Sequence, residues 1–160
     1  MSRLNFVALA MVLAMAVPAA HAQVKKGAKA QPVAEEQQTR PDFGVVKSKN
    51  SILSLGLDTC TISGRADFLE MRNGSSPGSH TQECVSKGKD DVKSAFDEVR
   101  KEFGKRKPPD ELIDWRVEWT AAFDAALPQV GDTERTYLQK VGDARRAADR
   151  ATVKLEISME

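Results

Sequence analysis

Apolar residues recur at helical spacing in the middle of the chain. Between positions 85 and 103 the steps are 7, 4, 3 and 4 residues, through Val85, Val92, Phe96, Val99 and Phe103. An α-helix turns every 3.6 residues, so this spacing puts all five side chains on one stripe, while the intervening lysines and aspartates face water. A stripe of this length predicts an amphipathic helix that packs against other helices.

Local signals set the ends of this helix. Ser79 followed three residues later by Gln82 has the form of a capping box and predicts the start. Gly104 and the Pro108-Pro109 pair end the helix, and Pro109 opens the next one, which we expect to extend to about residue 127. The inner stripe of that third helix is Leu112, Trp115, Trp119, Ala122, Phe123 and Ala126.

A fourth helix begins after Gly131, capped by Asp132 or Thr133. Its expected apolar face is Leu138, Val141, Ala144, Ala148, Ala151 and Leu155. Residues 153–159 alternate apolar and polar side chains, so a short terminal strand is an alternative for that segment.

The first ordered element is less well specified. Residues 51–57 suit either a strand or a helix; we favour a helix to about Arg72, weakened by Gly56 and Gly64. The turn-forming residues 73–78 end it. Short connections favour antiparallel neighbours, so the prediction is an all-α fold, a small up-and-down bundle of four helices, or of three plus an irregular first element, over residues 51–160.

Residues 1–22 resemble a secretory signal peptide. A cationic start with Arg3 precedes an apolar run over residues 4–17, and Ala20-His21-Ala22 has the form read by signal peptidase. The run is shorter than the roughly 20 residues of a transmembrane helix. We expect cleavage after Ala22, a periplasmic or secreted location, and no transmembrane segment in the mature chain.

Residues 23–50 are rich in lysine, glutamine and glutamate and poor in large apolar side chains. Such a composition cannot offset the entropy of ordering, so a flexible leader is predicted. Without Arg3 the mature chain has 23 basic and 23 acidic residues. This balance argues against a nucleic-acid partner, which needs a basic excess to neutralise phosphates.

The two cysteines, Cys60 and Cys84, both follow the predicted cleavage site. Disulfides form and persist in exported proteins, so we predict that these two pair and link the first two helices. The alternative is a reactive or metal-binding thiol pair, in which His80 and Glu83 supply further ligands.

Catalytic signals are sparse. His80 is the one histidine after the signal, and a triad with Ser75, Ser76 or Ser79 would lie within a single turn. Phosphate-binding loops, haem-attachment motifs and zinc-protease motifs are absent from the sequence. We therefore expect a protein that is not an enzyme and needs no cofactor or metal.

Two features are candidates for binding. The end of the second helix carries five cations, which would suit an acidic partner but also complement the helix dipole: Arg100, Lys101, Lys105, Arg106 and Lys107. Trp115 and Trp119, with Tyr137, could form an exposed platform, although the tryptophans share a stripe with Leu112 and Phe123, which favours core packing.

The sequence thus predicts an exported, non-enzymatic helical protein that binds another protein or a cell-envelope component. The alternative is a small inhibitor or immunity-type protein that blocks a cell-envelope hydrolase through the loop over residues 73–81.

Overall fold

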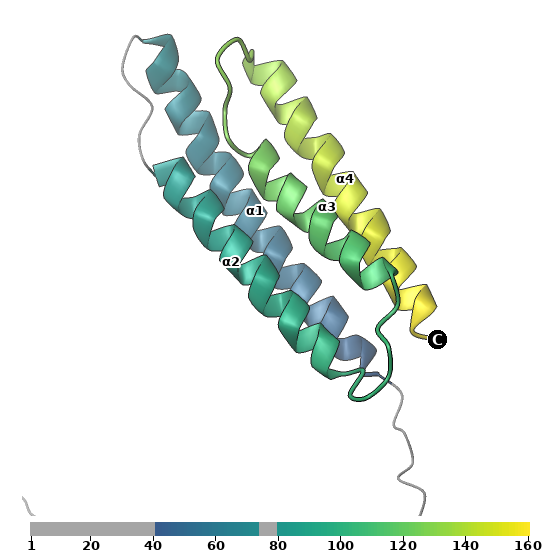
Figure 1. Ribbon diagram of the computed structural model, residues 1–160. Coiled ribbons are helices and arrows are strands. Elements are labelled where there is room, and N and C mark those ends of the chain that lie inside the picture. Colours follow the sequence, from purple (N-terminus) through teal and green to yellow (C-terminus); the bar gives the residue numbers. More distant parts are fainter. Residues whose placement is uncertain (1–40, 74–79) are drawn as a thin grey trace, which may run out of the picture. The chain divides into compact units, whose positions relative to one another are not determined.

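The computed structural model describes residues 41–73 and 80–160, which belong to one compact unit spanning residues 38–160. These residues form four helices, and no strand occurs among them (Figure 1). The helices are α1 (Phe43–Arg72), α2 (His80–Lys101), α3 (Glu111–Ala125) and α4 (Glu134–Ser158). The predicted all-α class with four helices is confirmed.

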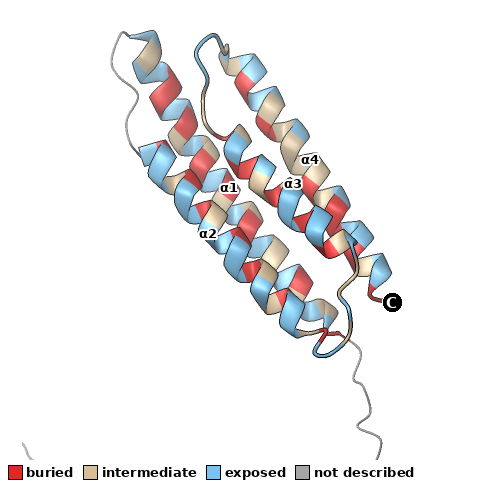
Figure 2. Ribbon diagram, viewed as in Figure 1, coloured by how far each residue is buried: buried red, intermediate tan, exposed pale blue. Residues whose placement is uncertain are grey.

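Consecutive helices run in opposite directions (Figure 1). Each helix packs against the next one in the chain, and α4 returns to pack against α1. Within the described residues α2 and α4 make no direct contact, so they occupy opposite corners of the bundle. Buried residues occur along all four helices (Figure 2), and their apolar members form one core cluster.

Helix α1 starts earlier than predicted. The boundary of the predicted leader at residue 50 is wrong, because α1 is already helical from Phe43. The Asp42 carboxylate accepts a hydrogen bond of 2.7 Å from the backbone N–H of Gly44, which caps the helix, and Val46 is fully buried in the core. The rest of the predicted leader and the predicted signal peptide lie outside the described residues.

The last residues are helical, so the alternative of a terminal strand is wrong. Leu155 and Met159 are buried one helical turn apart, whereas Val153 and Ile157 are exposed. The inner face of α4 also differs at its start, where Tyr137 is fully buried and the predicted Leu138 is 38% exposed. Thr133 caps α4 through a reciprocal pair of hydrogen bonds with Thr136.

Both tryptophans are fully buried in the core, as their stripe predicted. Trp115 Nε1 donates a hydrogen bond of 3.0 Å to Thr152 Oγ1 on α4. The Thr152 hydroxyl lies 2.7 Å from Asn50 Oδ1 and 3.0 Å from the Ala148 carbonyl oxygen. This buried network satisfies the indole N–H of Trp115 and joins α3, α4 and α1, whereas Trp119 Nε1 is buried without a hydrogen-bond partner among the described residues. Because both rings are fully buried, the tryptophans form no exposed platform.

The glycines of α1 and α2 permit close contacts between helices. A Cβ atom at Gly88 would lie 2.2 Å from the Phe123 ring, and one at Gly56 would lie 3.4 Å from the same ring. At Gly64 a Cβ atom would lie 2.2 Å from the Tyr137 hydroxyl and 2.7 Å from the Ala126 carbonyl oxygen. The glycines therefore lower helix propensity locally but make room for two aromatic side chains.

Cys60 on α1 and Cys84 in the first turns of α2 form the predicted disulfide, with an Sγ–Sγ distance of 2.03 Å. Cys60 is buried and Cys84 packs against the core cluster. The bond closes a loop with a sequence separation of 24 residues and joins the two helices near their connection.

Candidate functional site

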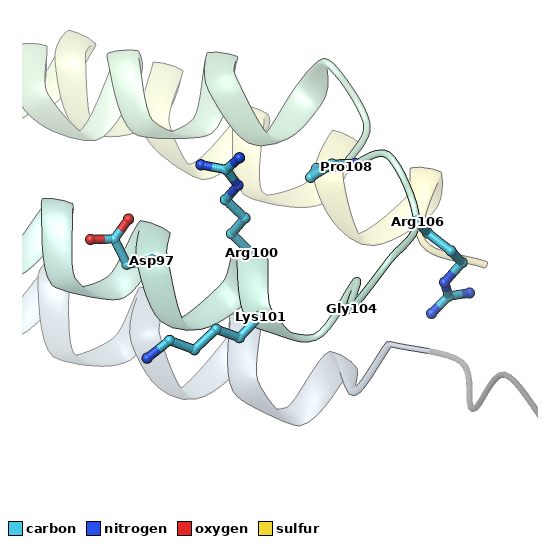
Figure 3. A pocket seen from close by; sticks show the side chains of 6 residues that line it. All are labelled: Asp97, Arg100, Lys101, Gly104, Arg106 and Pro108. Atoms are coloured by element: carbon cyan, nitrogen blue, oxygen red, sulfur yellow. The ribbon is translucent and has the colours of Figure 1, made fainter. Parts of the chain in front are cut away.

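The predicted basic surface lies at one end of the bundle. Arg100 and Lys101 are in the last turn of α2. The chain then turns through Gly104, whose φ of 54° favours glycine, and carries Lys105, Arg106 and Lys107 before α3. An open hollow of ≈ 490 Å³ lies here, lined by Asp97, Arg100, Lys101, Gly104, Arg106 and Pro108 (Figure 3).

The cationic side chains do not converge on one point. Arg100, Lys101 and Arg106 point in different directions around the hollow (Figure 3). Lys107 is paired with Asp110 at 3.7 Å, and both side chains are strongly exposed. The structure therefore gathers the predicted cations at one end of the bundle without building a pocket for a single anion.

Acidic side chains also reduce the positive potential at this end. A neighbouring open hollow on α2 is lined by Asp90, Asp97 and Glu98, together with two lysines and a serine. Lys49 on α1 lies 2.5 Å from the Glu98 carboxylate and lowers its pKa by hydrogen bonding, which keeps this carboxylate charged. The field at the end of α2 is thus mixed in sign.

The described residues considered for catalysis and metal binding include His80, Cys60 and Cys84. His80 is exposed at the start of α2, and the serines at 75, 76 and 79 lie outside the described residues. Both sulfur atoms of Cys60 and Cys84 are in the disulfide, so neither is available as a thiolate ligand. Across residues 41–73 and 80–160, no group of three or more His, Cys, Asp or Glu side chains is placed to hold a metal ion.

Helix α1 carries an exposed apolar surface that sequence reasoning missed. Its outer face carries a stripe of six residues, here called the outer stripe: Ile52, Leu55, Thr59, Ile62, Ala66 and Leu69. The four large side chains are 53%, 70%, 70% and 52% exposed, in chain order. Exposed apolar residues that form a continuous row mark interaction surfaces more often than isolated ones do.

The spacing of the outer stripe was a usable sequence signal. Its residues are separated by steps of 3, 4, 3, 4 and 3. The signal was hidden because α1 also carries an apolar inner face, which includes Leu53, Leu57 and Cys60. With apolar residues on both faces, no single stripe could be assigned to the core.

Other exposed apolar residues occur in smaller groups. Ile113 and Val117 lie one turn apart on α3, and Val153 and Ile157 do so on α4. The outer stripe of α1 is therefore the longest apolar row on the surface of this bundle.

No helix in the described part of the chain has both the length and the apolar character needed to cross a membrane.

Comparison of the chain with protein-family models, with curated proteins and with solved structures gives no match.

Proposed function

We propose that this protein is exported, has no catalytic role, and acts by binding a protein partner through the outer stripe of α1. The observation that carries the proposal is the exposure of Ile52, Leu55, Ile62 and Leu69 on one face of a single long helix. Burying large side chains of this kind is the main source of binding free energy at protein interfaces.

The rigidity of the bundle supports this role. The disulfide fixes α1 to α2, and the shared core holds α1 against α3 and α4. A partner would therefore meet a preformed surface and would not have to order it, which lowers the entropic cost of binding.

The predicted export is consistent with the same picture. Residues 1–22 have the composition of a signal peptide, and a disulfide is stable in the oxidising compartment to which such a peptide leads. N-terminal sequencing of the exported chain tests this step, and a start far from Gln23 would contradict it.

The basic end of α2 is a second candidate contact, suited to an anionic component of the cell envelope. Its support is the hollow lined by Arg100, Lys101 and Arg106, with Asp97 as the acidic member. Binding of the chain to vesicles rich in anionic lipid tests it. We expect weak binding that falls as salt rises and that is reduced in the double variant Arg100→Gln, Lys101→Gln.

The main test is affinity capture from an envelope fraction with the oxidised, exported chain as bait. Ile62→Lys places a charge in the middle of the outer stripe, whereas Val117→Lys makes the same change at a similarly exposed site on α3. We expect the wild type and Val117→Lys to capture the same protein and Ile62→Lys to fail to capture it. Direct binding is then measured between the purified components.

Equal capture by all three baits would contradict the proposal. A tight one-to-one complex with an envelope hydrolase, unaffected by Ile62→Lys, would favour the inhibitor hypothesis instead, in which the contact is the loop over residues 73–81.

A further inference from the structure

We infer that the outer stripe of α1 pairs with the same stripe of a second copy of this chain, in antiparallel orientation. The inference rests on the proposed role of this face as a protein-binding surface and names its partner. The spacing of the stripe, the sizes of its side chains and the charges beside it support the pairing.

The spacing is that of a coiled coil. Ile52, Thr59 and Ala66 occupy one position of a seven-residue repeat, and Leu55, Ile62 and Leu69 occupy the other. The repeat position on the opposite side of the helix, directly behind the stripe, is occupied by Leu57 and Gly64, which are buried in the bundle. The stripe therefore points directly away from the core and is exposed to solvent.

The sizes of the side chains favour the antiparallel orientation. A two-fold axis midway between Thr59 and Ile62 places large residues opposite small ones. Leu55 then packs over Ala66 of the second copy, and the outermost layers are filled by large side chains. The layers are Ile52 with Leu69, Leu55 with Ala66, and Thr59 with Ile62. A parallel pair would place Ala66 opposite Ala66 and Thr59 opposite Thr59, which leaves gaps between the helices.

The charges beside the stripe are complementary in the same register. Asp58 and Arg65 occupy equivalent flanking positions of successive repeats, and in an antiparallel pair these positions face each other. Asp58 therefore lies near Arg65 of the second copy, twice by symmetry. Within each copy Asp58 already pairs with Arg145, and Arg65 with Glu134, so the contact extends two existing ion pairs into a network.

The size of the contact sets the expected affinity. The stripe from residue 52 to residue 69 is about 26 Å long at about 1.5 Å per residue. Two helices in contact over this length bury less than the roughly 1,200 Å² at the lower bound of a stable interface. We therefore expect a dissociation constant in the micromolar range, with monomers at low concentration.

Sedimentation equilibrium of the oxidised, exported chain over a wide range of concentrations tests the pairing. We expect a monomer–dimer equilibrium that Ile62→Lys weakens about ten-fold or more and that Val117→Lys leaves unchanged. A wild-type chain that remains monomeric throughout, or equal effects of the two variants, would overturn the inference. Thermal unfolding of both variants shows that each remains folded.

Charge exchange tests the orientation. Asp58→Arg and Arg65→Asp alone each place like charges together and should weaken dimerisation, whereas the double variant should restore it. Within each copy, both changes also replace an exposed ion pair to α4 with like charges, which costs little stability at such exposed sites, and a thermal melt measures this cost. Weakening that is not restored in the double variant contradicts the antiparallel register.

Cross-linking tests the register itself. Leu55→Cys and Ala66→Cys chains with different tags are mixed and oxidised mildly, and peptide mapping confirms that Cys60 and Cys84 remain paired. The antiparallel register predicts cross-links between the two variants. Cross-links of Leu55→Cys to itself would indicate a parallel pair and overturn the inference.

These experiments separate the self-pairing from the proposed function. A monomeric wild type whose capture of a different protein is lost in Ile62→Lys would overturn self-pairing and leave the proposed function intact. Dimerisation lost in Ile62→Lys, with no other protein captured, would support self-pairing and contradict a role in binding a different partner.

Discussion

The two faces of α1 have similar composition and different surroundings. The inner face places Leu53, Leu57 and Cys60 at 0–1% exposure against α2, α3 and α4. The outer face places Leu55 and Ile62 at 70% exposure. The difference shows that apolar periodicity identifies a surface that can be buried, while the neighbouring helices determine which of two such surfaces is buried within the chain.

The largest contrast is expected between two leucines two residues apart. Leu57→Ala removes a fully buried side chain and should destabilise the fold by about 2–5 kcal/mol. Leu55→Ala makes the same change on the outer face and should alter stability by no more than about 0.5 kcal/mol. Chemical denaturation at low protein concentration, where the chain is monomeric, measures both. Equal losses would show that the outer stripe is buried within the chain.

Removal of the disulfide tests how the inner face is held. The double variant Cys60→Ser, Cys84→Ser lets the unfolded chain gain entropy, and a loop of this length predicts a loss of about 3 kcal/mol. The helical content at room temperature should be retained, because the bond joins only α1 and α2, and the shared core and the packing of α3 against α4 remain. Circular dichroism with thermal melting measures both quantities, and an unchanged melting temperature would contradict the expectation.

The close contacts at the glycines predict a smaller effect. Gly64→Ala forces the Tyr137 hydroxyl and the Ala126 carbonyl to move and should cost about 1–3 kcal/mol, despite the better helix propensity of alanine. Gly142→Ala is the control, since its Cβ atom meets Arg146 at an ordinary 3.5 Å. That variant should stabilise α4 by up to about 1 kcal/mol. Denaturant titration of the two variants should give shifts of opposite sign.

The smallest expected effect is the dependence of folding stability on pH. Burial, followed by the nearby Asp67 carboxylate, raises the pKa of Tyr137 to about 12 from its usual value of 10.0. Its hydroxyl lies 3.0 Å from the carbonyl oxygen of Ala126, to which it donates a hydrogen bond. The folded state thus holds the phenol proton more tightly than the unfolded state, so stability should fall as pH rises from 10 to 12.

Comparison of the wild type with Tyr137→Phe tests this pH dependence. The variant loses the hydrogen bond and should be less stable by about 1 kcal/mol at neutral pH. It should also lack the part of the alkaline loss that comes from Tyr137. Identical alkaline slopes in the two proteins would contradict the raised pKa.

Local sequence patterns were sufficient to predict most of the helices of the bundle. The stripe from Val85 to Phe103 predicted α2 because polar residues fill its other face, and the structure buries four of its five members and half-buries Phe96. The glycine and proline punctuation around residues 104–109 placed the end of α2 and the start of α3 within a few residues. Such signals work from sequence because each depends only on neighbours along the chain.

The candidate surfaces were less predictable. The five cations could be located from sequence, but the directions of their side chains and the acids beside them depend on how α2 meets the turn before α3. The start of α1 was missed because Phe43, Val45 and Val46 form a short apolar group at the end of a long polar stretch. The burial of Val46 depends on contacts with distant parts of the chain.

By itself the sequence determined the helical class, the approximate limits of α2 and α3, and the pairing of its two cysteines, because short-range periodicity, turn residues and cysteine number are properties of the chain alone. Only the tertiary structure decided which face of α1 is buried, why Gly64 and Gly88 have no side chain, and that Tyr137 replaces Leu138 in the core. Those outcomes depend on which atoms of other helices come within contact distance, and no local pattern specifies that distance.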